Sequence, residues 1–170
     1  VSRSALAFTA FDSFVSLETV NRQVPLVHPL DMAWMWRRLL VPIGFAHQSG
    51  VVHGAVLPPN ILIQPADHGL VLAGWYGALT SDDNHYGALT TGLADYKDWY
   101  PKEVLNKQPV SPATDIAMAA KSMVWLMGGN PRTGDTPVAV PTPIRAFFKG
   151  CLQGNQQARP QNAWALINEF

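Results

Sequence analysis

The sequence is poor in cysteine and in charge, and it has no long hydrophobic run. Its single cysteine, Cys151, excludes an internal disulfide, and a reducing compartment such as the cytoplasm is the simplest interpretation. The longest apolar stretch, residues 39–46, contains a proline and is too short to span a bilayer. Twelve basic residues balance twelve acidic ones, so no long-range field favours nucleic acid or an anionic membrane. We therefore expect a cytoplasmic location and partners that are neither nucleic acid nor membrane.

The start of the sequence has neither an initiator methionine nor the layout of a signal peptide. The expectation is that the chain begins partway into a longer protein. Its 170 residues are enough for one domain with a substantial core. Only 14% of the residues are charged, whereas 48% are apolar. This composition predicts some apolar surface that a neighbouring domain or another protein covers.

Apolar periodicity predicts a mainly helical chain with one small β-hairpin. Short aliphatic runs at 60–64 and 70–73 flank a turn and predict the hairpin. The predicted helix over 115–127 is apolar nearly all round, interrupted mainly by Lys121 and Ser122, and should therefore be buried on most sides. The other helices are expected over 16–24, from Asp31 to Gly50 with a kink at Pro42, from Thr142 with its hydroxyl as the cap, and from Pro160 onward.

The most informative segment is His53-Gly54-Ala55-Val56-Leu57-Pro58-Pro59-Asn60, which is followed by an apolar run. Its spacing of histidine, proline and asparagine resembles the catalytic loop of protein kinases, His-Arg-Asp-Leu-x-Pro-x-Asn. Because a short pattern of this kind also arises by chance, it needs support from other segments.

Three further segments resemble the same family and follow in the family's order. Residues 70–76 fall where the family has an apolar strand followed by Asp-Phe-Gly, and Glu103 is retained from the Ala-Pro-Glu segment. Asp115 resembles the aspartate at the start of a buried helix, and Arg159 resembles the arginine that pairs with that glutamate. Four matches in order favour a kinase-like C-terminal lobe over a generic helical domain with one chance match.

The resemblance implies a mainly α, protein-kinase-like C-lobe over residues 1–170, from a hinge region near 8–14 to the last helix. The glycine-rich loop and the lysine of the N-terminal lobe do not occur in these residues. We therefore expect the N-lobe to be absent from this chain. Residues 130–141 leave little room for the helix that the family usually places after its buried helix. This shortening could expose an apolar surface to a partner.

The residues that perform the chemistry in that family are replaced here. Ala55 occupies the position of the catalytic-base aspartate, and Gly74 occupies that of the magnesium-binding aspartate. Leu57 stands where a lysine or another polar residue is usual, and Gly54 stands where an arginine would bind a phosphorylated activation segment. Asn60 matches a second metal ligand, but one neutral amide is a poor site for magnesium, which prefers several hard oxygen ligands. Asn60 is therefore at most a weak nucleotide-binding residue.

Other polar residues offer no clear replacement for the missing aspartates. Asp82 and Asp83 lie eight and nine residues after Gly74, in a segment that we expect to be too mobile for catalysis. His85 lies beside them, but the sequence offers no second histidine or cysteine at a metal-binding spacing. We therefore expect no metal site and no cofactor, with ATP as the one nucleotide to test.

Four matched residues are expected to have structural roles. His53 should pack in the core, and the Asp115 carboxylate should accept backbone hydrogen bonds from its own helix and from the loop near His53. Glu103 and Arg159 should form a buried ion pair between the end of the activation segment and the last helices.

The resulting prediction is a pseudokinase, a catalytically inactive kinase-like module that acts as a scaffold or an allosteric domain through protein contacts. The partner would be another protein or a neighbouring domain of the same polypeptide. Trp75 and Trp99 flank the variable segment and are the predicted interface residues. Two alternatives stay open: a metal-independent nucleotide-binding sensor, and a divergent ATP-dependent phosphotransferase.

Overall fold

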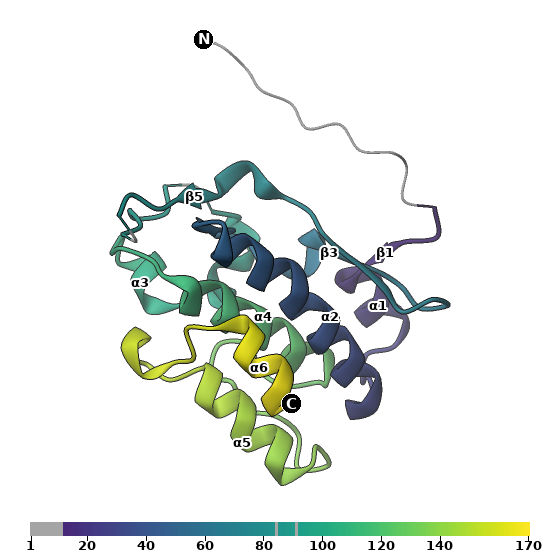
Figure 1. Ribbon diagram of the computed structural model, residues 1–170. Coiled ribbons are helices and arrows are strands. Elements are labelled where there is room, and N and C mark those ends of the chain that lie inside the picture. Colours follow the sequence, from purple (N-terminus) through teal and green to yellow (C-terminus); the bar gives the residue numbers. More distant parts are fainter. Residues whose placement is uncertain (1–11, 84, 91) are drawn as a thin grey trace.

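The computed structural model describes residues 12–83, 85–90 and 92–170 (Figure 1). Most of the proposed hinge region at 8–14 lies outside these residues. The described part is mainly helical and has two small antiparallel sheets, which agrees with the predicted class. Its helices are α1 (Leu17–Gln23), α2 (Pro29–Gln48), α3 (Lys102–Leu105), α4 (Pro112–Leu126), α5 (Thr142–Cys151) and α6 (Ala163–Glu169), with short 3-10 helices η1 (Pro58–Asn60), η2 (Trp75–Gly77), η3 (Ala94–Trp99) and η4 (Gln156–Ala158).

The predicted hairpin is present, but the two sheets extend beyond it. Strands β3 (Ile61–Gln64) and β4 (Gly69–Leu72) are antiparallel, and β1 (Val15–Ser16) adds to the free edge of β3. A second sheet pairs β2 (Val51–Val52) with β5 (Leu79–Thr80). The sequence did not predict β1, β2 or β5, because two residues are too few to show the alternation of a strand.

Helix α2 begins earlier than predicted. It starts at Pro29 rather than Asp31, because the imidazole of His28 accepts a hydrogen bond from the Leu30 amide and caps the helix. The helix continues through Pro42 and ends at Gln48, ahead of Gly50, whose φ of 70° lies in the left-handed region. Proline removes one backbone donor from a helix, and here the remaining turns continue as helix on both sides of it.

The starts of the three later long helices also differ from the prediction. Ser111 and the hydroxyl of Thr114 form a capping box, so α4 begins at Pro112 and Asp115 lies one turn inside it. Thr142 is the first residue of α5 instead of its cap, and its hydroxyl accepts a hydrogen bond from Arg145. Asn162 caps α6, which therefore begins at Ala163, three residues after Pro160.

Helices α2 and α4 form the centre of the molecule. In Figure 1, α5 and α6 lie on one side of this pair and the strands lie on the other, and α2 contacts both α6 and β4. Trp36 of α2 is fully buried and meets the rings of Phe147 and Phe148 edge-on at 5.8 and 5.2 Å. Edge-to-face aromatic pairs at this separation add to the stability from burial. None of the described helices has both the length and the apolar character that crossing a membrane requires.

Candidate functional site

One buried carboxylate holds the loop that resembles a catalytic loop. Asp115 of α4 is fully buried, and its two oxygens accept hydrogen bonds from the backbone amides of His53 and Gly54 at 2.7 and 2.8 Å. Its Oδ2 also lies 2.9 Å from Nε2 of His47 on α2. The expected contact with the loop is therefore present. The expected capping of its own helix is not, because Ser111 and Thr114 provide the cap.

His53 is a fixed core residue in this loop. Its Nδ1 accepts a hydrogen bond from the Ala55 amide, so Nε2 carries the proton that is donated to the carbonyl of Ala73 at 2.8 Å. Burial lowers the pKa of His53, and this effect outweighs the opposing influence of Asp115. The ring also meets Trp75 edge-on with centroids 4.3 Å apart. A neutral imidazole with both nitrogens engaged is a structural element and is not available as a base.

Ala55 and Leu57 are apolar and buried. They stand at the two positions where the resemblance would place polar residues facing a substrate. Ala55 is only 4% exposed, and its methyl group has no proton acceptor. Leu57 is fully buried and belongs to the main hydrophobic core. Neither side chain can orient a hydroxyl group or contact a phosphate.

The position that the resemblance assigns to a metal-binding aspartate is closely packed. Gly74 has a φ of 79°, which L-residues rarely adopt. A Cβ atom placed there would lie closer than 3.0 Å to the side chain of Asn60. Asn60 is fixed in this place because its Nδ2 donates to the carbonyl of Ala55 at 2.9 Å. The amide that resembled a metal ligand therefore packs against the backbone of Gly74.

Gly54, at the position where the resemblance places an arginine, is closely packed in the same way. Gly54 has a φ of 73°, and a Cβ atom there would overlap the side chain of Leu89. A long basic side chain would need this loop to move. Glycine itself offers no basic group to a phosphorylated segment.

The other acidic candidates lie on the surface. Asp82 and Asp83 are exposed, and backbone hydrogen bonds between Asp82 and His85 close the turn that carries them. His85 Nδ1 lies 2.9 Å from the carbonyl of Asp83, within the same turn. Across the described ranges, no group of three or more His, Cys, Asp or Glu side chains could hold a metal ion.

The predicted ion pair between Glu103 and Arg159 is present and buried. The guanidinium donates to both carboxylate oxygens, at 2.6 and 3.0 Å, and Thr114 donates to the same carboxylate at 3.1 Å. Burial alone would raise the pKa of Glu103, but the hydrogen bonds from Arg159 and the other donors outweigh it and lower the pKa. The pair ties α3 to the segment before α6.

Both tryptophans that the sequence suggested as interface residues are partly buried. Trp75 donates from Nε1 to the carbonyl of Leu72 at 2.8 Å and borders an open apolar hollow of about 880 Å³. Val41 and Phe45 of α2 line the same hollow and are 42% and 69% exposed. Trp99 instead packs edge-on against Trp125, at 5.9 Å. The interface roles of both tryptophans remain predictions. The open apolar surroundings of Trp75 suit an interface better than the packed surroundings of Trp99 do.

Sequence reasoning missed three polar residues that the structure brings into buried contacts. His47 contacts Asp115, and Thr114 contacts Glu103. His47 and Thr114 both lie in helices, and each contacts a residue more than ten positions away in the sequence. No local sequence signal therefore identifies these contacts. Lys121 had a visible signal, since a lone lysine interrupts the apolar helix α4.

Comparisons with known proteins identify distant relatives. Serine/threonine-protein kinase F of Synechocystis sp. is 25% identical over 118 residues, which cover 66% of this chain and 22% of that protein. Death-associated protein kinase dapk-1 of Caenorhabditis elegans is 24% identical over 144 residues, which cover 79% of this chain and 10% of that protein. No protein-family model matches the chain.

The chain is distantly similar to protein kinases. The identities are low, and the chain spans only about a fifth and a tenth of the length of these two curated relatives. The similarity therefore supports a kinase-like relationship at a coarse level. The activity of the chain has to be argued from its own site.

Proposed function

We propose that this chain is a kinase-like C-lobe, part of a pseudokinase that is catalytically inactive and acts through contacts with another protein or with a neighbouring domain. The single observation that carries this proposal is the contact between Gly74 and Asn60. The left-handed backbone conformation and the close Asn60 amide both disfavour the carboxylate that kinase-like chemistry needs for magnesium.

The loss of the general base supports the same proposal. A positioned base typically contributes about 10²- to 10⁴-fold to the rate, and the Ala55 methyl group provides none of this. A buried Leu57 and a neutral, fully engaged His53 leave this loop with no replacement. The fixed carboxylate of Asp115 preserves the shape of the loop while its chemistry is lost.

The apolar hollow beside Trp75 supports action through contact. Exposed apolar side chains that gather in one place often mark a surface that another protein covers. Phe45 and Val41 lie on α2, whose backbone is fixed in the core, so the hollow has a rigid wall. A rigid apolar surface suits binding, because little conformational entropy is lost on contact.

The test is a thermal unfolding titration with ATP, in the presence and absence of magnesium, on the full 170-residue chain. We expect no shift in the unfolding temperature under either condition. A shift that needs no metal would instead support a nucleotide sensor. A shift that needs magnesium, followed by transfer of labelled phosphate that is abolished by Asn60→Ala, would support an active phosphotransferase and contradict our proposal.

A further inference from the structure

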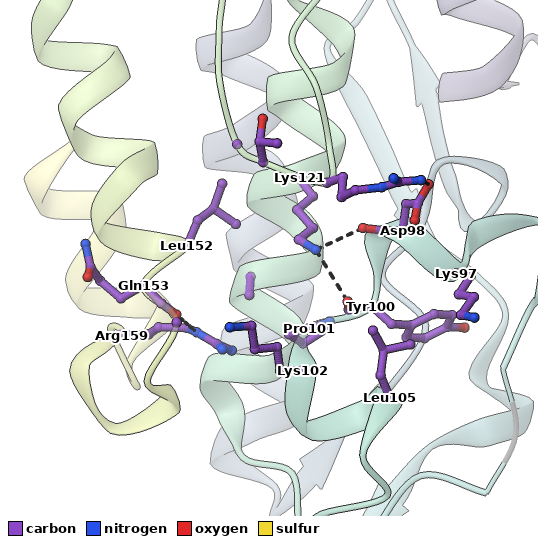
Figure 2. Close-up of a pocket in the computed structure, with 15 residues that line it drawn as sticks. Lys97, Asp98, Tyr100, Pro101, Lys102, Leu105, Lys121, Leu152, Gln153 and Arg159 are labelled. Carbon is purple, nitrogen blue, oxygen red and sulfur yellow. Dashed lines mark hydrogen bonds and ion pairs between the residues drawn. The ribbon is translucent and has the colours of Figure 1, made fainter.

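A second pocket, remote from the loop just described, collects much of the positive charge of the chain. It is a cavity of about 260 Å³ between η3, α3, α4 and the segments around 132–134 and 152–154 (Figure 2). The basic residues that line it are Lys97, Lys102, Lys121, Arg132 and Arg159. They are five of the twelve basic residues in a chain of zero net charge, and only one acidic residue, Asp98, lines the same cavity.

Two of these five charges are already compensated. Arg132 pairs with Asp98 at 2.7 Å, and Arg159 pairs with Glu103 at 2.6 Å. Three lysines remain, and none of them forms an ion pair with an acidic residue in the part of the chain that the structure describes. Like charges that share a small concave space repel each other, so an anion bound there would be stabilised.

Lys121 is the central group of this site. It projects from the apolar helix α4, and its ammonium group donates to the carbonyls of Asp98 and Tyr100 at 2.9 and 3.4 Å (Figure 2). An ammonium group has three N–H donors, so one remains for a ligand. Burial, and after it the nearby charge of Arg159, lower the pKa of Lys121 to about 8, against the opposing influence of Asp98 and Glu103. Holding a partly buried cation whose direct contacts are carbonyls only costs stability, which a ligand would recover.

The size and charge of the cavity define the class of ligand. Drug-sized ligands occupy pockets of roughly 300–1,000 Å³, so this cavity suits a single small charged group. A phosphate monoester carries about −1.5 to −2 charges at neutral pH and three strong acceptor oxygens. This matches three ammonium groups that form no direct ion pair better than a carboxylate does. Lysine is a common phosphate ligand, acting as a point charge with mobile donors.

We propose that the cavity around Lys121 is a binding site for a phosphate monoester, carried either by a small metabolite or by a phosphorylated side chain. The site is separate from the kinase-like loop and does not depend on its activity. Lys121 and Lys102 would hold the phosphate oxygens, and the 132–134 segment would form the outer wall. The short segment after α4 thus borders a cavity with several basic residues in its lining, and Val138 of the same segment is 87% exposed, so the apolar surface that the sequence suggested there stays a prediction.

Isothermal titration at constant ionic strength tests the site, with glycerol 3-phosphate and a short phosphoserine peptide as the two probes. We expect at least one probe to bind, and Lys121→Gln to weaken that binding by about 10-fold or more, because a charge-assisted contact is lost. Lys149→Gln is the matched control, since Lys149 is exposed on α5 and does not line the cavity. Binding of only one probe identifies the source of the phosphate.

Failure of both probes to bind at millimolar concentration would overturn the proposal, as would equal losses in Lys121→Gln and Lys149→Gln. If Lys121→Gln does not fold, the probe is added to the unaltered chain instead, and the changes in its backbone amide chemical shifts locate the binding site. Shifts on probe binding should appear at Gly134 and Gly154, which line the cavity. Shifts centred on Asn60 and Gly74 would place the anion in the kinase-like loop and contradict the site.

Discussion

At the scale of single residues, the packing of Gly74 decides whether position 74 can hold an aspartate. Gly74→Asp should destabilise the fold by roughly 1–3 kcal/mol from backbone strain alone, with more from the overlap with Asn60. Gly87→Asp is the control, because Gly87 is exposed and nothing lies within 4 Å of an added Cβ. Urea unfolding measures both variants, and equal effects would argue against the packing described here.

The double variant Asn60→Ala with Gly74→Asp separates steric overlap from backbone strain. Removing the Asn60 amide frees the space that the new carboxylate needs, so the double variant should be more stable than the sum of the two single effects predicts. Simple additivity would mean that the backbone conformation alone excludes the aspartate.

At the scale of elements, the Glu103–Arg159 pair joins α3 to the last helices. Glu103→Gln leaves the buried guanidinium uncompensated and should cost about 3–5 kcal/mol of unfolding free energy near pH 7. The pKa of Glu103 is lower in the folded chain than its ordinary value of 4.5. The stabilisation is therefore complete above pH 4.5 and is lost as the pH falls through the folded-state pKa.

Denaturant unfolding of both proteins between pH 7 and pH 3 checks this prediction, and the difference between them should shrink below pH 4.5. Asp98→Asn is the matched control, since its pair with Arg132 is exposed and should contribute much less. A difference that stays constant down to pH 3 would show that the carboxylate charge of Glu103 is not the stabilising feature.

At the scale of the whole molecule, two phenylalanines distinguish the core from the open apolar hollow. Phe148 is fully buried against Trp36, and Phe148→Ala should cost about 3–5 kcal/mol of stability. Phe45 is 69% exposed beside Trp75, and Phe45→Ala should change stability by only about 0.5 kcal/mol. Phe45→Ala should also reduce the binding of an apolar dye. If Phe45→Ala lost as much stability as Phe148→Ala, the surface around Phe45 would be packed and not open.

The main helices were predictable because their signals are local and long. The stripe of Met32, Met35, Trp36 and Leu39 predicted α2, and the nearly continuous apolar run predicted a buried α4. Their first residues were wrong by two or three positions, since His28 caps one helix and Ser111 with Thr114 caps the other. The two-residue strands were not predictable, because their pairing depends on segments far apart in the chain.

The sequence by itself determined that positions 55 and 74 carry no carboxylate, because alanine has only a methyl group and glycine only a hydrogen in any fold. It also indicated that Asp115, Glu103 and Arg159 lie in segments that fold into the core, where a charged side chain needs a partner. Only the tertiary structure decided that Asn60 closes the space at Gly74 and that lysines from three elements surround one cavity. The physical reason is distance along the chain: side-chain identity is a local property, whereas space and electrostatic potential arise from segments that folding brings together.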